Sequence, residues 1–372
     1  MIYLDYNATA PIKPAVRAAV AEAMENGGNP SSVHRFGRLA RRQMDEARQA
    51  VAAMIGVKPS QVIFTSGGTE ANGLALRGMG AAELIASSIE HDSVLANSTY
   101  PERLPVTKQG VVDLNAADNI LKNAPNNSCV SVMLVNNETG VIQPVAEIVK
   151  LAKLYGHKIH CDAVQAAGRL PLDFALLGVD ALTLSAHKIG GPQGVGALIV
   201  GEKLALQAQQ RGGGQEMNRR AGTENVAGIV GFGVAAQLVV SDLPDMQRLA
   251  ALRDRLQQRL LEIGGDGAEV LGGDAPRVAN TLSIAMRGVS SETQVAAMDL
   301  AGVAVSAGSA CSSGKVKASH VARAMGYTDD VAGSTLRISL GWNTKDADID
   351  RCIDAWQALF QRTRKKSQTE AA

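Results

Sequence analysis

A lysine follows a short apolar segment in the stretch ALTLSAHKIGGPQG, where Ser185, His187 and Lys188 come at the end of a strand predicted over 181–186. An amine beside a buried strand end is desolvated, which lowers its pKa and makes the neutral form accessible. A neutral amine is what Schiff-base chemistry requires. The alternative is an ordinary surface lysine in a turn, but the polar side chains gathered around Lys188 favour a functional one.

The stretch FTSGGTEANG combines two glycines with the start of a predicted helix. Glycine lets the backbone approach a ligand closely, and the exposed N–H groups of a helix start favour an anion. We interpret Gly68 and Thr69 as part of a phosphate site, with the Thr69 hydroxyl as a further donor. A helix capped by Thr69 without any ligand fits this motif equally well.

Asp162 lies near the end of another predicted apolar strand, KIHCDA (158–163). The neighbouring His157, His160 and Cys161 suggest a metal site. Strand alternation argues against one, because it places His160 and Asp162 on one face and Cys161 on the other, which is no preferred zinc spacing. A carboxylate at the end of a buried strand is costly without a positive partner, and a protonated pyridine nitrogen is such a partner.

A single cysteine, Cys311, occurs in the stretch AVSAGSACSSGKVKASH among small residues typical of a loop. A buried structural cysteine usually has apolar neighbours, which Cys311 lacks. From this stretch alone, an accessible reactive thiol competes evenly with a non-functional surface thiol or a small buried residue.

Taken together, these groups suggest a site for pyridoxal 5′-phosphate. They comprise a phosphate site, an amine, an anion for a ring nitrogen and a stacking candidate, His91, in SSIEHDS after another predicted strand. The cofactor would act as an electron sink, and Asp162 would tune it by keeping the ring nitrogen protonated.

An open α/β sheet with helices on both faces is predicted to position these residues, since helical and strand-like segments alternate along the first two thirds of the chain. The helices are expected at Pro14–Asn26 and Ser32–Ile55, and the strands at 61–66, 83–88, 129–135, 158–163, 181–186 and 195–200. After about Leu243 a charged amphipathic helix and short strand-like pieces indicate a second, smaller α+β domain.

The composition excludes several classes of protein. The chain has 372 residues, 46% of them hydrophobic, and a formal net charge of +1, which argues against nucleic-acid or membrane partners recognised through bulk charge. The four cysteines are scattered without a CxxC pair, so we expect reduced thiols and no structural zinc. Without a visible signal peptide or long apolar run, the protein is expected in the cytoplasm.

The chain resembles the cysteine desulfurases, the NifS/IscS-like members of the class V aminotransferase group of pyridoxal-phosphate enzymes. The shared motifs follow in order along almost the whole chain: YLDYNATAP, GNPSSVHRFGR, FTSGGTEAN, VNNETG, CDAVQAAG, SAHKIGGPQGVG, RRAGTEN, SAGSACSSG and LRISLG. The resemblance implies the fold type I of these enzymes. A large domain (14–245) would contain a mainly parallel seven-stranded sheet, and a small domain (1–13 with 246–372) would carry the loop of Cys311.

The resemblance also implies a role for each site residue. Lys188 would form the internal aldimine, His91 would stack on the ring and transfer protons, and Cys311 would be the nucleophile. The cofactor's ring and phosphate would be bound by Gly68, Thr69, His91, Asn137, Asp162, Gln165, Ser185 and His187, with Thr223 from the other subunit of a homodimer. The substrate would be bound by Asn137 and Arg337, with Asn29 near the entrance; no metal ligand is assigned.

The reaction implied is removal of sulfur from L-cysteine to give L-alanine and a persulfide on Cys311. The sulfur would pass to an acceptor protein, such as an iron–sulfur scaffold. Trp342 stands where many relatives have Arg, and Gln215 where some have His. The chain also lacks the longer C-terminal tail with which housekeeping members contact their scaffold, so a nitrogen-fixation-type or other specialised role is plausible.

Other functions remain open at this point. Within the same group of enzymes, the alternatives are a selenocysteine lyase or an aminotransferase, and an aminotransferase would not need Cys311. A catalytically silent sulfur-trafficking subunit would be expected to lack the lysine, yet Lys188, Asp162 and His91 are all present.

Overall fold

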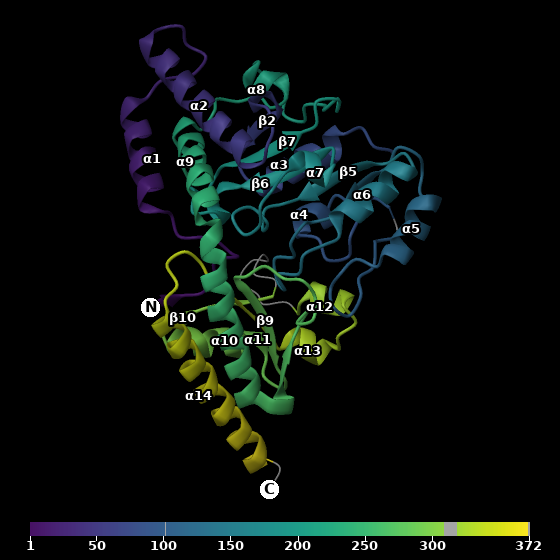
Figure 1. Cartoon of the computed structure of the whole chain (residues 1–372), viewed down its shortest axis with the longest axis vertical. Helices are drawn as coiled ribbons and strands as arrows, with labels where there is room; N and C mark the ends of the chain where they lie inside the picture. Colours follow the sequence, from purple (N-terminus) through teal and green to yellow (C-terminus); the bar gives the residue numbers. More distant parts are fainter. Residues whose placement is uncertain (101, 309–317, 371–372) are drawn as a thin grey trace.

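A computed structural model of the chain describes residues 1–100, 102–308 and 318–370. It has two lobes stacked along the long axis of the molecule (Figure 1). The strands are β1 (Ile2–Tyr3), β2 (Val62–Thr65), β3 (Leu84–Ala86), β4 (Cys129–Ser131), β5 (Lys158–Asp162), β6 (Ala181–Ser185), β7 (Gly196–Val200), β8 (Ala268–Val270), β9 (Thr281–Met286), β10 (Val303–Ala304), β11 (Ser306–Ala307) and β12 (Thr335–Ser339).

The helices alternate with the strands in the first lobe and surround a smaller sheet in the second. They are α1 (Pro14–Asn26), α2 (Arg35–Met54), α3 (Gly68–Gly78), α4 (Asp92–Leu95), α5 (Leu114–Asn123), α6 (Val145–Leu154), α7 (Phe174–Leu177), α8 (Gln215–Asn218), α9 (Val226–Asp242), α10 (Met246–Gly264), α11 (Ser291–Leu300), α12 (His320–Ala324), α13 (Asp329–Gly333) and α14 (Asp346–Glu370), with short 3₁₀ turns of which η2 (Ala186–Lys188) matters below.

The predicted α/β architecture is confirmed, with one correction to the strand count. In the described residues the large sheet has six strands, in the order β2-β7-β6-β5-β4-β3, rather than seven. Strands β3 to β6 are parallel, and β7 is antiparallel to both its neighbours. Beyond β3, Leu104 makes only an isolated bridge to Ser87. Pro105 follows it and has no N–H to donate, so the ladder does not continue.

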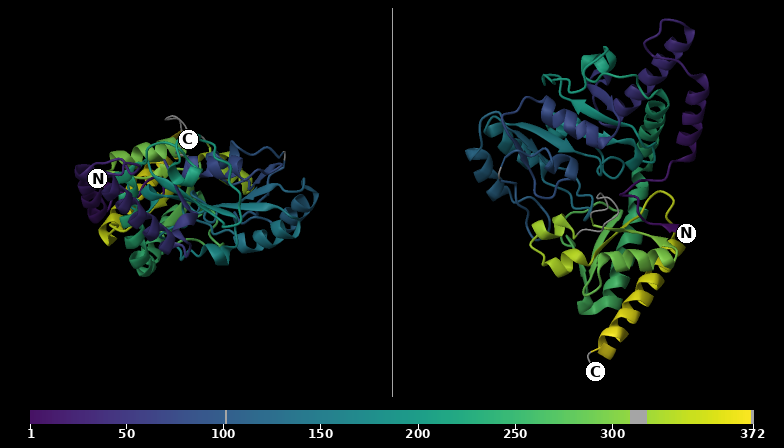
Figure 2. Two further views of the ribbon diagram at one scale, coloured as in Figure 1. Left: turned by 90° about the horizontal axis from the view of Figure 1, so that it is seen from above. Right: turned by 180° about the vertical axis from the view of Figure 1, so that it is seen from behind.

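The sheet is covered on both faces because its strands are apolar on both faces. Along β2, Val62 and Phe64 belong to the cluster that contains Phe232 of α9, whereas Ile63 belongs to the cluster that contains Leu74 of α3. This follows from the alternation of side chains along a strand. The two layers of helices around the strands are visible from above in Figure 2.

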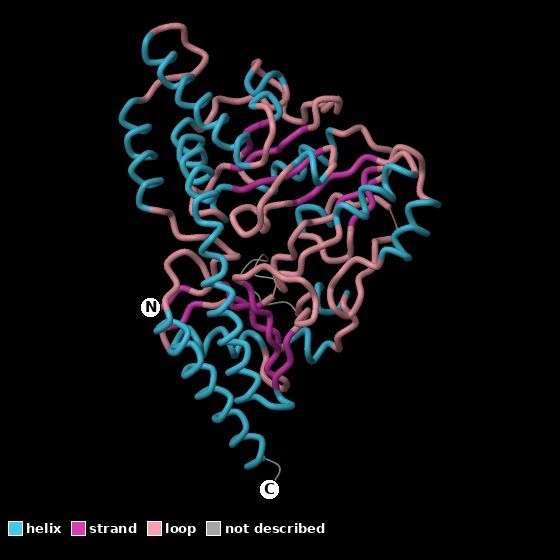
Figure 3. The backbone as a smooth tube through the Cα atoms, in the orientation of Figure 1, coloured by secondary structure: helices cyan, strands magenta, loops and turns pink. Residues whose placement is uncertain are grey.

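Helix α9 continues almost directly into α10 and connects the lobes, as the tube in Figure 3 shows. The stretch 226–267 is the one helical segment of the described residues that is long and apolar enough to cross a membrane by length and composition. Its apolar part, α9, packs against α1 and α2, and Phe232 and Ala236 are fully buried there. Core helices satisfy the same criterion, so its hydrophobicity is explained by packing.

The second lobe is built on the antiparallel sheet β11-β12-β9-β8. Its core contains Trp356 of α14, which is fully buried, and Leu4 from the N-terminal arm. The arm is held by parallel pairing of β1 with β10, in the register Ile2↔Val303. The arm then runs on towards the junction of the lobes, where it becomes part of the site described next.

Candidate active site

A cavity of about 660 Å³ opens beside the carboxyl ends of β5 and β6, the place where open α/β sheets bind ligands. Asp162 and Ser185 are the last residues of these two strands. The cavity brings together most of the predicted site. It is lined by Gly68, Thr69, His91, Asn137, Asp162, Gln165, Ser185, His187, Lys188 and Arg337, together with Asn7, Ala8, Asn72, Asp92, Ser93, Met133 and Val164.

Lys188 ends the turn η2 directly after β6, which places its amine at the cavity. Its Nζ donates to the backbone carbonyls of Asn7 (2.6 Å) and Ala8 (2.7 Å) in the N-terminal arm. Beside it, burial and the positive charge of Lys188 lower the pKa of His187 to about 4. His187 is therefore neutral at pH 7, with its Nδ1 bonded to the Thr9 hydroxyl at 3.0 Å.

Asp162 is buried at the cavity wall and is held by two donors. The Nδ2 of Asn72 donates to Oδ2 (2.8 Å), and the backbone N–H of Val164 donates to Oδ1 (3.0 Å). Both bonds stabilise the charged carboxylate. The arrangement suits a carboxylate that must remain ionised to pair with a cation in the cavity.

A second carboxyl group nearby is kept neutral. Glu90 is completely buried, and desolvation raises its pKa to about 8, with a further contribution from the charge of Asp162. Glu90 is therefore protonated at neutral pH and adds no negative charge near Asp162.

His91 is oriented by the start of α4. Its Nδ1 accepts the backbone N–H of Ser93 (3.1 Å) and lies 2.8 Å from the Ser93 hydroxyl. The Ser93 hydroxyl also accepts from Nδ2 of Asn72 at 2.9 Å. Because Nδ1 accepts a backbone N–H, the neutral ring carries its hydrogen on Nε2. A chain of hydrogen bonds thus links His91 through Ser93 and Asn72 to Asp162.

The start of α3 forms an anion site at one end of the cavity. The N-cap is Gly67, which has no side chain, so the alternative in which Thr69 caps the helix is wrong. The buried Ser185 Oγ has no hydrogen-bond partner among the described residues. An adjoining space of about 240 Å³ is lined by Gly68, Thr69, Ser185 and His187 among others. Helix N–H groups and an unused hydroxyl suit a bound phosphate.

Arg337 reaches the cavity from β12 of the second lobe. Its Nη2 pairs with Asp5 (2.9 Å) and its Nη1 donates to the carbonyl of Asn137 (3.1 Å). Its Nε and the Asn137 side-chain oxygen are buried without partners in the described part of the chain. The Arg337 Nε–H therefore retains capacity to donate to a ligand such as a carboxylate, and the Asn137 oxygen can accept from a ligand that carries a donor.

Two predicted residues are not at the cavity of this single chain. Asn29 lies exposed in the turn between α1 and α2, where its Oδ1 accepts from the N–H of Ser31. Thr223 lines a separate small pocket beside Ser66. Their roles stay predictions, as does that of Cys311, which lies outside the described residues.

Trp342 and Gln215, the two residues that depart from the family pattern, each make a hydrogen bond to the backbone. Trp342 donates its indole N–H to the carbonyl of Pro11 at 3.3 Å and so holds the arm near the site. Gln215 accepts the N–H of Gly222 through its side-chain oxygen at 3.2 Å.

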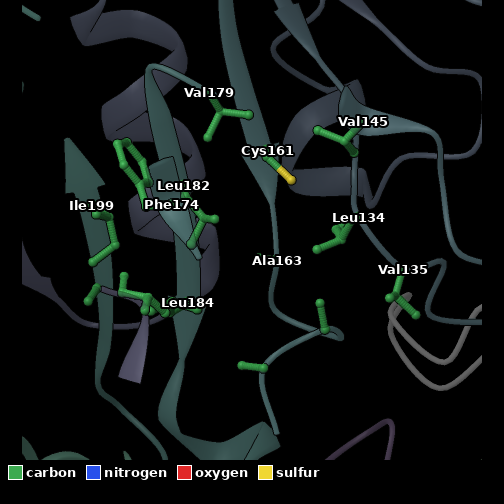
Figure 4. Close-up of a cluster of buried hydrophobic side chains, with 14 of the residues drawn as sticks. Leu134, Val135, Val145, Cys161, Ala163, Phe174, Val179, Leu182, Leu184 and Ile199 are labelled. Atoms are coloured by element: carbon green, nitrogen blue, oxygen red, sulfur yellow. The ribbon is translucent and has the colours of Figure 1, made fainter. Parts of the chain in front are cut away.

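The three described cysteines are poor nucleophiles. Cys129, Cys161 and Cys352 are fully buried, and burial raises the pKa of Cys129 and Cys352 to about 12 and that of Cys161 well above its usual value. Figure 4 shows Cys161 among aliphatic side chains such as Leu134 and Val145. A thiolate is needed for nucleophilic attack, so these three thiols are structural. In residues 1–100, 102–308 and 318–370, no group of three His, Cys, Asp or Glu side chains could hold a metal ion.

Sequence reasoning missed Asn7 and Asn72. Asn72 comes three residues after Thr69 in α3, a spacing that places both on neighbouring positions of one helix face, and this could have indicated it. Asn7 had no such signal, because its hydrogen-bond partners Gln165, Lys188 and Thr281 are far away in the sequence.

Comparisons with known proteins agree with this geometry. Residues 2–352 match the aminotransferase class-V family. The chain is 37% identical to the cysteine desulfurase IscS of Dictyoglomus turgidum and 38% identical to an IscS-like cysteine desulfurase of Mycobacterium tuberculosis, covering 98% of this chain and 95% and 98% of the relatives. The solved structure of a NifS-like protein from Rickettsia africae matches with a TM-score of 0.91 and 34% identity over 97% of this chain and 99% of that one. The chain therefore belongs to the class-V aminotransferase family, in the group of the cysteine desulfurases.

Proposed function

We propose that the protein is a pyridoxal-phosphate-dependent cysteine desulfurase that removes sulfur from L-cysteine and releases L-alanine. The observation that carries this proposal is the convergence of Lys188, Asp162, His91 and Arg337 on one cavity from different elements. The relatives with this function are similar over nearly their whole length.

The residues present fit the cofactor at both of its ends. The Ser185 hydroxyl, which has no partner within the described residues, and the first N–H groups of α3 suit its phosphate. The space between them depends on Gly68, because a Cβ there would lie 3.1 Å from Val164 Cγ2 and 3.7 Å from Ser185 Cβ. At the other end, Asp162 would hold the ring nitrogen and Gln165 the ring hydroxyl. When bound, pyridoxal phosphate supplies an electron sink for the substrate's α-carbon.

The chain's own groups bind the substrate and move its protons. Arg337 and Asn137 bind the substrate carboxylate, and Asp5 keeps the guanidinium oriented. Lys188 would hold the cofactor through its Nζ, and the same atom would accept the proton removed from the substrate's α-carbon. His91 carries its hydrogen on Nε2; it would stack on the ring of a bound cofactor and would donate a proton during the later steps.

The sulfur-accepting nucleophile is Cys311. The other three thiols are buried with raised pKa values, which favours Cys311 by exclusion. Its thiolate attacks the substrate sulfur, the S–S bond forms and the substrate C–S bond breaks, leaving its electron pair on the carbon side. Protonation of that carbon skeleton yields alanine, and Cys311 keeps the persulfide.

The protein acts as a cytoplasmic homodimer in this proposal, and the exposed Asn29 and the separately placed Thr223 contribute to the site of the partner subunit or to its entrance. The persulfide passes to an acceptor protein such as an iron–sulfur scaffold. A sedimentation measurement giving a monomer under turnover conditions would contradict the dimer.

The test is incubation of the cofactor-loaded protein with L-cysteine, followed by measurement of alanine and sulfide and by peptide mass spectrometry. We expect alanine and one added sulfur atom on the peptide that contains Cys311, with the peptides of Cys129, Cys161 and Cys352 as internal controls. Alanine without that adduct would refute the persulfide mechanism.

Two variants separate the alternative functions. Cys311→Ala is expected to lose cysteine turnover while it still binds the cofactor; retained turnover favours a mechanism that needs no thiol. Lys188→Ala is expected to lose the visible absorbance of the lysine-bound cofactor. A wild-type protein without that absorbance after loading would favour a silent sulfur-trafficking subunit. A preference for selenocysteine over cysteine would indicate a selenocysteine lyase.

A further inference from the structure

A buried arginine, Arg169, lies directly behind the cavity. Its side chain is in the wall between the lobes, and the whole residue is 8% exposed. Its Nη1 donates to the carbonyl (2.5 Å) and to the side-chain oxygen (2.6 Å) of Gln165, and its Nη2 donates to the side-chain oxygen of Asn7 (3.0 Å). Sequence reasoning did not single it out.

These contacts determine how the Gln165 amide is oriented. A guanidinium group can only donate hydrogen bonds, so the amide oxygen must face Arg169. The amide nitrogen then donates one hydrogen to the carbonyl of Asn7 at 2.9 Å. Its second hydrogen remains for a ligand in the cavity, which Gln165 lines. Arg169 therefore presents Gln165 to the cavity as a donor.

The charge of Arg169 has no carboxylate partner among the described residues, since all its bonds go to neutral acceptors. An uncompensated buried charge is costly. Burial and the charge of Arg337 lower the pKa of Arg169 to about 9, so it is still protonated at neutral pH. A guanidinium held in this way favours a negatively charged ligand on the far side of Gln165.

The other charged groups around Arg169 are already paired or are themselves cations. Arg337 pairs with Asp5, Lys13 with Asp242, and Asp245 with Arg248. Lys188 contributes positive charge when it is protonated. The titratable and charged residues that line the small cavity beside Arg169 are Tyr6, Lys13, Lys188, Asp242 and Asp245.

We propose that Arg169 is a positioning residue that orients the Gln165 amide as a donor and supplies positive charge behind the ring-oxygen end of the cofactor site. The inference rests on the proposed function, because the anion it serves is the ring oxygen of pyridoxal phosphate. A positive charge near that oxygen stabilises its anionic form and opposes protonation of the imine nitrogen formed with Lys188. Removal of the charge is therefore expected to raise the pH at which the bound cofactor loses its proton.

The experiment follows the visible absorbance of the cofactor-loaded protein during a pH titration, which needs no turnover. In Arg169→Met we expect the midpoint to rise by about one pH unit. Arg169→Lys keeps the charge and is expected to titrate close to the wild type. Arg169→Gln restores a donor without charge, so its midpoint is expected to resemble that of the Met variant.

The matched control is Arg253→Met, which removes another buried arginine from α10, away from the cavity. Thermal unfolding of every variant accompanies the titration. A purely structural role of Arg169 predicts lower thermal stability with an unchanged midpoint, and that result would overturn the inference. If Arg169→Met does not fold, the role of the charge is tested by comparing Arg169→Gln with Arg169→Lys, and equal titration midpoints in these two variants refute it.

A wild type that shows no visible cofactor absorbance contradicts the proposed function itself. Failure of the proposed function is therefore distinguishable from failure of the inference about Arg169.

Discussion

Glu90→Gln is expected to stabilise the protein increasingly as the pH rises. Glu90 is completely buried next to the charge of Asp162, and its pKa is raised from the ordinary 4.5 to about 8. At neutral pH the folded protein therefore holds a proton that the unfolded chain has released. One oxygen of Glu90 accepts from the Ser87 hydroxyl (2.5 Å) and from the N–H of Met133 (2.7 Å), and a glutamine oxygen can accept both.

The sign follows from proton linkage. A carboxyl group with a raised folded-state pKa contributes its full stability below pH 4.5 and loses it as the pH rises to about 8, because the folded state binds more protons than the unfolded state in this window. The rise of the pKa from 4.5 to about 8 corresponds to a loss of about 5 kcal/mol of stability. Glutamine does not titrate, so the variant does not lose this stability.

The assay is urea unfolding of wild type and Glu90→Gln at several pH values between 4.5 and 8.5, with Glu46→Gln on the exposed face of α2 as a control. The difference in the free energy of unfolding between Glu90→Gln and wild type should grow steadily across this range, whereas that of the control should not. A difference independent of pH would refute the conclusion that Glu90 is protonated in the folded protein. A variant less stable than wild type at pH 8 would show that the site requires the charged carboxylate.

Two further predictions concern the cofactor site and the packing that supports it. Asn72→Ala removes the donor to Asp162 Oδ2, and a hydrogen bond to a charged group is worth about 1.5–3 kcal/mol. The affinity for the cofactor, measured by absorbance titration of the apoprotein, should therefore fall about 10- to 100-fold. The exposed Asn123→Ala should bind like the wild type, and equal affinities of the two variants would contradict the role of Asn72. Glu216→Gln breaks the buried pair of Glu216 with Arg48 (2.7 Å), which should lower the free energy of unfolding by about 3 kcal/mol. Glu46→Gln breaks an exposed pair with Arg42 and should have no resolvable effect on stability. Equal effects of the two variants on the free energy of unfolding would show that the buried pair adds nothing.

Local patterns were sufficient to predict the residues that end strands. Lys188, Asp162 and Ser185 each lie at or just beyond the end of an apolar run, and parallel strands bring their carboxyl ends to one edge. The helix at Pro14–Asn26 was predicted with its observed bounds. The strand predicted over 129–135 was too long: the strand itself is Cys129–Ser131, and beyond it only single N–H groups, those of Val132 and Leu134, still donate to carbonyls of β5 before the chain bends at Leu134.

The supporting residues could not be predicted in this way. Gln165 and Arg169 are four positions apart in one turn, but Asn7, the partner of both, is 158 and 162 positions away. No periodicity relates such positions, since the hydrogen bonds exist only after the N-terminal arm has paired with β10 and crossed to the first lobe.

Residue types and their spacing along the chain were enough to predict the chemistry available to this protein: the amine of Lys188, the carboxylate of Asp162, the glycines before a helix start, and the strands that carry these groups. Which charges are compensated depends instead on the tertiary structure. Asp5 pairs with Arg337, Glu90 is neutral and Arg169 has no carboxylate partner in the part of the chain that the structure describes, because burial and long-range contacts, rather than neighbours in the sequence, set the electrostatic environment of each group.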